Sequence, residues 1–279
     1  MAGGKYILSL SCEDKSGIVA AVSGFLAENG GFIVESAQFG DPSTKRFFMR
    51  VEFESKDNLK DKFASIAEQF NMDWDIFDES IRPRVLIAVS KAGHCLNNLL
   101  YRHESGNLKV DIVGVISNHQ DLEGMAKRHG VNFQHLPVTP ETKPEQEKQI
   151  LDIVEKENID VVVLARYMQI LSPDLCKKLK GKAINIHHSF LPGFKGADPY
   201  RQAYDRGVKI IGATAHYVTK ELDEGPIIEQ EVIRVDHTDA SEDLKSLGQD
   251  IESRVLARAL RNHIEHRIIL NEGKTVVFK

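Results

Sequence analysis

The sequence predicts an α/β protein in which a ferredoxin-like βαββαβ domain precedes a larger, doubly wound domain with a mostly parallel sheet. Three observations support this prediction. At 279 residues the chain is long enough for two hydrophobic cores. Strand and helix spacings follow the order βαββαβ over about the first 80 residues. Helix and strand patterns then alternate regularly after a boundary at 81–84. We therefore expect domains at 1–82 and 83–279.

The first domain should contain four strands and two helices. Residues 18–28 have helical apolar spacing and end at Asn29-Gly30-Gly31, which is a helix-stop signal. Residues 47–53 alternate between apolar and polar side chains, as a half-buried antiparallel strand does. The other expected elements are strands at 6–11, 32–39 and 72–77 and a helix at 59–70.

The second domain should begin with a buried strand, because residues 85–89 are continuously apolar. Helices at 94–103, 121–129, 145–157 and 173–180 should alternate with strands at 110–116, 133–136, 160–164 and 183–187. Strands at 209–218 and 226–235 are expected to extend the sheet in antiparallel fashion. A long helix over 241–269 and an edge strand at 275–278 complete the prediction.

The composition excludes several classes of partner. A net charge of −5 gives no footprint for nucleic acid, and no apolar run reaches the length of a membrane span. Cys12, Cys95 and Cys176 are an odd number of widely spaced cysteines without CxxC spacing, which indicates reduced thiols. The first residues also lack the apolar region of a signal peptide. We therefore expect a cytoplasmic protein.

The first turn of the second domain, at 90–96, contains a single glycine and neither GxGxxG nor GxxxxGK[ST]. This argues against a dinucleotide or nucleoside triphosphate site. The start of the following helix remains available for a weak contact with an anion.

The end of the strand at 183–187 carries the strongest chemical signal. Asn185 and His187 are two residues apart, so alternation places them on the same face. An amide can stabilise an oxyanion, and an imidazole can donate to it or move a proton. This pair therefore indicates acyl-group chemistry.

Asp223 is a candidate third member of the site. Gly225-Pro226 forces a turn after it and could direct the carboxylate back towards the sheet, although an acid in a loop can also simply cap its turn. With Asn185 and His187 it would support attack on a formyl or similar carbonyl. No GxSxG motif indicates a covalent serine route. The neighbours His187 and His188 should face opposite ways, so we expect no metal site.

Three motifs resemble one family. They are N-I-H-x-S-x-L-P at 185–192, L-D-x-G-P-I at 222–227 and V-L-A-R-Y-M-Q-I-L-S at 163–172. Their order and spacing resemble the folate-dependent formyltransferase fold family over about residues 84–279.

The resemblance implies roles for particular residues. Asn185, His187 and Asp223 match the catalytic trio of the family. Main chain around Met168, Leu171 and Leu222 would bind the pterin, and His216 would belong to the same pocket. The pocket should lie at the carboxyl edge of the strands near 164, 186 and 217. The folate is then the substrate, and no cofactor is required.

Two features point to one branch of the family. His188 stands where many members have proline, and the turn at 90–96 lacks the glycine-rich loop that holds a ribonucleotide acceptor. Both resemble the formyltetrahydrofolate deformylases, in which water replaces the amine acceptor and the products are formate and tetrahydrofolate. Such an enzyme supplies formate to the one-carbon pool and purine synthesis. The alternatives are transfer of the formyl group to an amine and a non-catalytic folate or amino-acid sensor.

The first domain resembles an ACT domain. The loop that contains Asp14 and Gly17 would bind an amino-acid effector, or these residues would only begin the helix and pack closely. In the second case the domain would serve assembly. Pairing of ACT sheets predicts a homo-oligomer.

Overall fold

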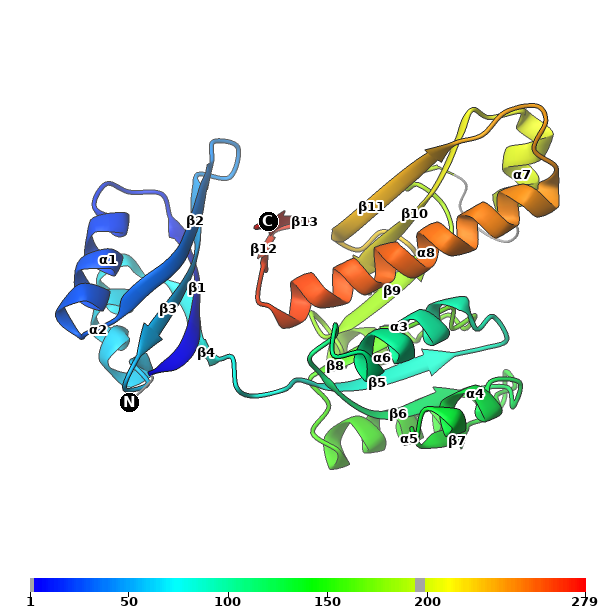
Figure 1. Cartoon of the computed structure of the whole chain (residues 1–279), viewed down its shortest axis with the longest axis horizontal. Coiled ribbons are helices and arrows are strands. Elements are labelled where there is room, and N and C mark those ends of the chain that lie inside the picture. Colours follow the sequence, from blue (N-terminus) through cyan, green and yellow to red (C-terminus); the bar gives the residue numbers. More distant parts are fainter. Residues whose placement is uncertain (1–2, 194–198) are drawn as a thin grey trace. The chain divides into compact units, whose positions relative to one another are not determined.

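The computed structural model describes residues 3–193 and 199–279, which divide into two compact units. The first unit contains the chain up to Arg82 together with Asn262–Lys279, and the second unit is Pro83–Arg261 (Figure 1). The helices within the described residues include none that is both long and apolar enough to span a membrane.

The first unit has the expected βαββαβ order. Its described residues form an antiparallel sheet of four strands in the order β2-β3-β1-β4, with both helices on one face (Figure 1). The elements are β1 (Gly4–Glu13), α1 (Ile18–Glu28), β2 (Phe32–Asp41), β3 (Arg46–Ser55), α2 (Lys60–Phe70) and β4 (Asp73–Asp78).

Aromatic and aliphatic side chains form the core between this sheet and its helices. Phe63 of α2 packs edge-on against Phe25 of α1 and against Trp74 of β4. Every second residue of β1 from Tyr6 to Cys12 joins the same cluster. Alternation along the strands and helical spacing along α1 therefore place the apolar side chains on the faces by which the sheet and the helix pack together.

The last residues of the chain differ from the prediction of one long helix. Helix α8 (Ser241–Ile264) ends before His266, which has a φ of 49°, a left-handed conformation that a helix cannot accommodate. The strands β12 (Ile268–Asn271) and β13 (Lys274–Val277) then pair with each other. The predicted strand at 275–278 is therefore one arm of a hairpin and not an edge of the large sheet.

Contacts with β3 and β4 explain why this hairpin segment belongs to the first unit. The Arg50 side chain is only 2% exposed, and its Nε donates to the carbonyl oxygen of Glu265. The His266 ring stacks on Phe77. The second unit consequently ends at Arg261, and the expected range 83–279 does not describe one compact body.

The second unit is built on a sheet of seven strands in its described residues, in the order β11-β10-β9-β8-β5-β6-β7. Strands β9, β8, β5, β6 and β7 are parallel neighbours, and β10 and β11 add to the edge in antiparallel fashion, as expected. The strands are β5 (Arg84–Val89), β6 (Asp111–Ser117), β7 (Phe133–His135), β8 (Val161–Leu164), β9 (Ala183–His187), β10 (Ile210–Tyr217) and β11 (Ile227–Arg234).

Helices cover both faces of this sheet. Side chains of α5 and α6 pack on one face with Leu86, Ala88, Val162 and Leu164. Helix α8 crosses the other face over β9 and β10 and meets α3 (Figure 1). The helices are α3 (His94–Glu104), α4 (Glu123–Arg128), α5 (Lys143–Lys156), α6 (Pro173–Lys178) and α7 (Pro199–Arg206), besides α8. Helix α7 was not expected from the sequence.

Candidate active site

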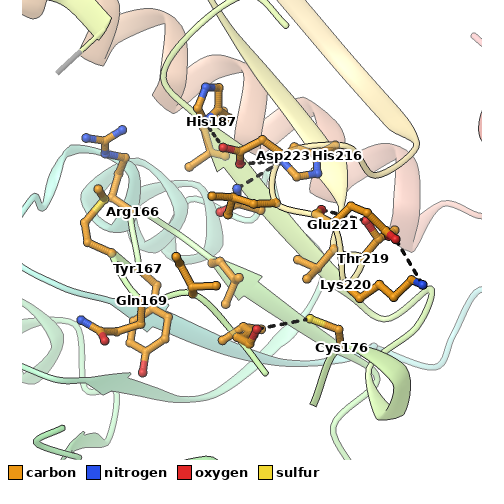
Figure 2. Close-up of a pocket in the computed structure, with 18 of the residues that line it drawn as sticks. Arg166, Tyr167, Gln169, Cys176, His187, His216, Thr219, Lys220, Glu221 and Asp223 are labelled. Atoms are coloured by element: carbon orange, nitrogen blue, oxygen red, sulfur yellow. Dashed lines mark hydrogen bonds and ion pairs between the residues drawn. The ribbon is translucent and has the colours of Figure 1, made fainter. Parts of the chain in front are cut away.

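A pocket of about 270 Å³ lies in the second unit, between the loop after β8, the end of β9 and the loop after β10 (Figure 2). The catalytic and substrate-binding residues expected from the sequence all line it. They are Asn185, His187, Asp223, Met168, Leu171, His216 and Leu222.

Strand register places the polar side chains of the pocket side by side. Asn185 of β9 lies opposite His216 of the antiparallel strand β10 and beside Leu164 of the parallel strand β8. Residues opposite one another in adjacent strands share a face. Strand β10 is antiparallel to β9, so its last residue, Tyr217, lies opposite Ile184 near the start of β9. The residue of β10 that lies opposite Asn185 is therefore His216, one position before the strand ends.

Hydrogen bonds determine how Asn185 and His216 are oriented. The His216 Nδ1 lies 2.9 Å from the carbonyl oxygen of Tyr217, which can only accept, so Nδ1 carries a proton. In the neutral ring Nε2 is then an acceptor, and it lies 3.2 Å from the Asn185 Nδ2. One N–H of the amide is thereby held by His216, and its second N–H can bind a substrate oxygen.

A tight loop between β10 and β11 directs Asp223 towards the sheet. Asp223 has a φ of 57°, a conformation that Asp tolerates better than most residues. Any side chain at Gly225 would place its Cβ 1.7 Å from the Tyr217 carbonyl oxygen, so only glycine fits there. The backbone N–H of Tyr217 donates to the carbonyl oxygen of Pro226 at 2.9 Å and closes the loop.

The Asp223 carboxylate lies between two imidazole rings (Figure 2). Its Oδ2 is 3.2 Å from the His187 Nδ1, and its Oδ1 is 3.6 Å from the His216 Nε2. Burial by itself raises the pKa of Asp223, but the hydrogen bond with His187 outweighs it and holds this pKa below its usual range. Asp223 is therefore ionised at neutral pH and can accept a hydrogen bond from the His187 Nδ1.

Apolar side chains surround the mouth of the pocket. Met168, Ile170 and Leu222 are more than half exposed although they are large and apolar. The backbone N–H of Met168 donates to the Ser90 Oγ at 3.0 Å, which ties this loop to the end of β5. Exposed apolar groups on a fixed loop are typical of a site that binds a flat, partly apolar ligand.

His188 differs from its predicted orientation. His187 and His188 both line the pocket, and their ring centroids are 5.1 Å apart. Strand β9 ends at His187, so the alternation that would send adjacent side chains to opposite faces does not extend to His188. Burial, and then the positive charge of Arg166, lower the pKa of His188 to about 3.

A second cluster of polar residues lies behind His188, and sequence reasoning missed it. Glu252 of α8 is completely buried, with one carboxylate oxygen 2.8 Å from the His94 Nε2 and 3.4 Å from the Arg166 Nε. The other oxygen accepts from the Tyr200 hydroxyl. A sequence signal exists, because helical spacing places Glu252 on the same stripe as the buried residues Gly248, Val255, Leu256 and Ala259.

His94, Cys95 and Glu252 have ligand-type atoms within 4.8 Å of one another, which is the spacing of a metal site. The Arg166 guanidinium contacts the same Glu252 oxygen as His94 does. Burial, together with the nearby Glu252 charge, raises the pKa of Cys95 and keeps it a thiol. We therefore assign this carboxylate to Arg166 and not to a cation.

The expected effector-binding positions lie in the first unit. The Asp14 side chain is exposed, and its backbone N–H donates to the carbonyl oxygen of Lys45. Gly17 has a φ of 94° immediately before α1, whose first turn has no side-chain cap. Asp14 is thus not the cap of this helix.

Comparisons with known proteins identify the family of this chain. The formyl transferase family model matches residues 83–260. A formyltetrahydrofolate deformylase of Bacillus subtilis is 50% identical, over 97% of this chain and 93% of that protein. The crystal structure of a formyltetrahydrofolate deformylase from Burkholderia mallei covers 99% of this chain and 100% of its own, with 51% identity and a TM-score of 0.94.

The second unit also resembles transferases. A phosphoribosylglycinamide formyltransferase structure from Anaplasma phagocytophilum is 32% identical over 71% of this chain and 96% of its own, with a TM-score of 0.66. The match to the deformylases is higher in identity and extends over both units. The chain therefore belongs to the formyltetrahydrofolate deformylase family.

Proposed function

We propose that this protein hydrolyses 10-formyltetrahydrofolate to formate and tetrahydrofolate. The observation that carries the proposal is the contact of Asp223 with His187 and His216, beside Asn185, at the end of an apolar pocket. The identity with deformylases over both units supports water as the acceptor.

The pterin ring is proposed to occupy the part of the pocket formed by Met168, Leu171 and Leu222. The loop after β8 lines this part of the pocket, and the bond from the Met168 N–H to the Ser90 Oγ fixes its position. Backbone N–H and C=O groups on a fixed loop can pair with the donor and acceptor edge of a pterin, while apolar side chains cover its faces.

His187 and Asn185 are proposed to stabilise the tetrahedral oxyanion that forms when water attacks the formyl carbon. Asp223 orients the His187 ring, and His216 orients the Asn185 amide. Two donors that are held in place before the reaction stabilise a developing charge without reorganisation.

Asp223 is also proposed to take the proton of the attacking water. Its lowered pKa makes it a weak base, but the water becomes strongly acidic as its oxygen bonds to carbon, so a weak base suffices. The carboxyl group then passes the proton to N10 of the folate as the C–N bond breaks. The formic acid released loses its proton to solvent, and formate and tetrahydrofolate leave.

Incubation of the protein with 10-formyltetrahydrofolate alone tests the proposal. We expect one formate for each tetrahydrofolate formed, without any amine present. Turnover that starts only when an amine is added would instead identify a formyltransferase. Folate binding without any turnover would identify a sensor.

We propose in addition that the first unit is an ACT domain. Its βαββαβ order and the glycine turn before α1 support this. An amino acid bound near Asp14 and Gly17 would alter the rate of hydrolysis. Calorimetry and rate measurements with glycine, methionine and other amino acids test this role, and lack of binding would leave assembly as the function of the unit.

The exposed edge strand β2 supports a homo-oligomer. Strand β2 lies at the edge of its sheet, and its large apolar residues Phe32, Val34 and Phe39 are all exposed. Such an edge pairs readily with a second copy. We expect a Val34→Lys variant to shift the mass measured by light scattering towards the monomer.

The buried free cysteines support the cytoplasm as the location of the protein. The resemblance supports a place in the one-carbon pool and purine synthesis.

A further inference from the structure

We propose that His188 binds the attacking water and is a fourth catalytic residue beside Asn185, His187 and Asp223. The inference rests on the proposed hydrolysis and deepens it, because it names the group that positions the nucleophile. Three observations carry it, and they concern the position of the ring, its hydrogen bonding and its charge.

The first observation is the position of the ring. His188 follows directly after β9 and lines the same pocket as His187 and Asp223, although only 8% of its surface is exposed. It packs against the His187 ring on one side and against the Tyr200 ring on another. Packing on two sides fixes the imidazole at the catalytic end of the pocket.

The second observation is that the ring has no hydrogen-bond partner among the residues that the structure describes. His188 makes ring contacts there and no polar ones. His188 is not among the residues whose side-chain nitrogen is both fully buried and unpaired, so solvent reaches its ring, and water commonly supplies a partner where a polar cavity adjoins such a group. The pocket beside His188 offers that space.

The third observation is the set of charged groups around the ring. Arg166 approaches from the loop after β8 and Glu252 from α8, while His187 and Asp223 lie on the pocket side and Tyr200 on α7. Burial and Arg166 lower the pKa of His188, so the ring is neutral at physiological pH. A neutral imidazole has one bare nitrogen, which can accept a hydrogen bond from water, whereas the charged ring has none.

These contacts define how the water attacks. One O–H of the water donates to the bare nitrogen of His188 and the other to Asp223, so a lone pair faces the formyl carbon. The water oxygen bonds to this carbon, and the carbonyl electron pair moves to the oxygen held by Asn185 and His187. The proton on Asp223 passes to N10, the C–N10 bond breaks, and formate leaves after loss of its remaining acidic proton. His188 orients the water and keeps its own protonation state.

The test compares water with a second nucleophile. Hydroxylamine attacks a formyl group through its nitrogen and gives formylhydroxamate and tetrahydrofolate, and its stronger nucleophilicity makes it less dependent on a positioning group. We compare the unsubstituted protein with His188→Leu, with His188→Asn, which retains a hydrogen-bond acceptor, and with His103→Leu as a matched control. His103 is a partly buried imidazole of α3 whose Nδ1 lacks a hydrogen bond, and it does not line the pocket.

We expect His188→Leu to lower the kcat for formate release about 100-fold. Formylhydroxamate formation and the Kd for tetrahydrofolate should change far less. His188→Asn should recover part of the formate rate, and His103→Leu should leave both products unchanged. If His188→Leu does not fold, His188→Phe keeps the packing on Tyr200 and carries the same expectation.

Two results would overturn the role of His188. One is an unchanged formate rate in His188→Leu, and the other is an equal fall of both products, which would mean that the ring only supports the pocket. A protein without substitutions that forms formylhydroxamate but no formate would contradict the proposed hydrolysis itself. The two failures are therefore distinguishable.

Discussion

Asp223 is the residue on which the candidate site depends most. It contacts His187 and His216, and its backbone adopts a left-handed conformation two residues before Gly225. A carboxamide in its place would keep the shape of the side chain, lose the negative charge, and no longer accept a proton.

We predict that Asp223→Asn lowers kcat by about 10²- to 10⁴-fold, because proton transfer and the charge that supports His187 are both lost. Binding of tetrahydrofolate, measured by calorimetry, should remain within a few-fold of the unsubstituted protein. Asp205→Asn is the control, because Asp205 is an exposed acid that pairs with Arg201 on α7. Unchanged hydrolysis in Asp223→Asn would refute its assignment.

His188 should also make the stability of the protein depend on pH. The pKa of the folded residue is lowered to about 3, whereas an unfolded histidine has a pKa near 6.5. As the pH falls below about 6.5 the unfolded state gains a proton that the folded state does not accept until about pH 3, so this residue destabilises the fold progressively across that window. Asp223 acts at lower pH, because its lowered pKa stabilises the folded state until the pH falls through its folded value.

We therefore predict that His188→Gln loses less thermal stability than the unsubstituted protein between pH 7 and pH 4.5. The quantity to compare is the decrease in Tm over this interval, measured by circular dichroism. His237→Gln removes an exposed histidine and should reproduce the unsubstituted decrease. Parallel decreases in all three proteins would contradict a neutral, buried His188.

Helix α8 supplies the residues that support the site from behind His188. Gly248 leaves room for the Tyr200 ring, since a Cβ there would lie 2.1 Å from ring atoms. Tyr200 then reaches Glu252 one turn further along the same helix. Burial raises the pKa of Glu252, but the hydrogen bond from His94 and the charge of Arg166 outweigh this effect and lower it. The helix thus supplies the anion that holds Arg166 beside His188.

We predict that Glu252→Ala lowers the free energy of unfolding by about 3–5 kcal/mol, because the mostly buried Arg166 is left without its anion. Urea denaturation measures this difference. Glu242→Ala changes an exposed acid in the first turn of the same helix and should have a much smaller effect. Similar losses in the two variants would show that the Arg166 pair contributes little.

At the scale of the whole molecule, the first unit is made from two separate parts of the chain. The segment Asn262–Lys279 returns to it after the second unit is complete. The Arg50 guanidinium is held there by Glu35 and by the carbonyl oxygen of Glu265, and the Arg267 guanidinium lies 3.5 Å from the same Glu35 carboxylate. The first unit is therefore incomplete until the last residues have been added.

We predict that a chain ending at Arg261 has a destabilised first unit and an intact second one. Amide hydrogen exchange should become faster in β2 and β3, where the lost contacts lie, and stay unchanged in β5 and β8. Removal of Lys279 alone is the control, because this residue is exposed and lies outside β13. Uniform protection in the shortened chain would show that the hairpin is dispensable.

Local patterns were sufficient for most of the elements. The stop signal at Asn29-Gly30-Gly31 located the end of α1, and the continuous apolar run of β5 identified a buried strand. The predicted end of α8 at residue 269 was wrong, because apolar residues continue beyond Ile264 and extend the helical pattern. The left-handed conformation of His266, which ends the helix, has no strong signal in the sequence. Helix boundaries that depend on one backbone conformation are poorly determined by periodicity.

The sequence by itself predicted the order of most elements, placed Asn185 and His187 on one face and named Asp223 as their candidate partner, because alternation along a strand and the Gly225-Pro226 turn are local properties. Only the tertiary structure decided that His216 orients Asn185, that His188 faces the same pocket, and that Glu252 lies behind it. It also decided that the last residues complete the first unit. These contacts join residues far apart in the chain, and strand register and helix packing bring them together.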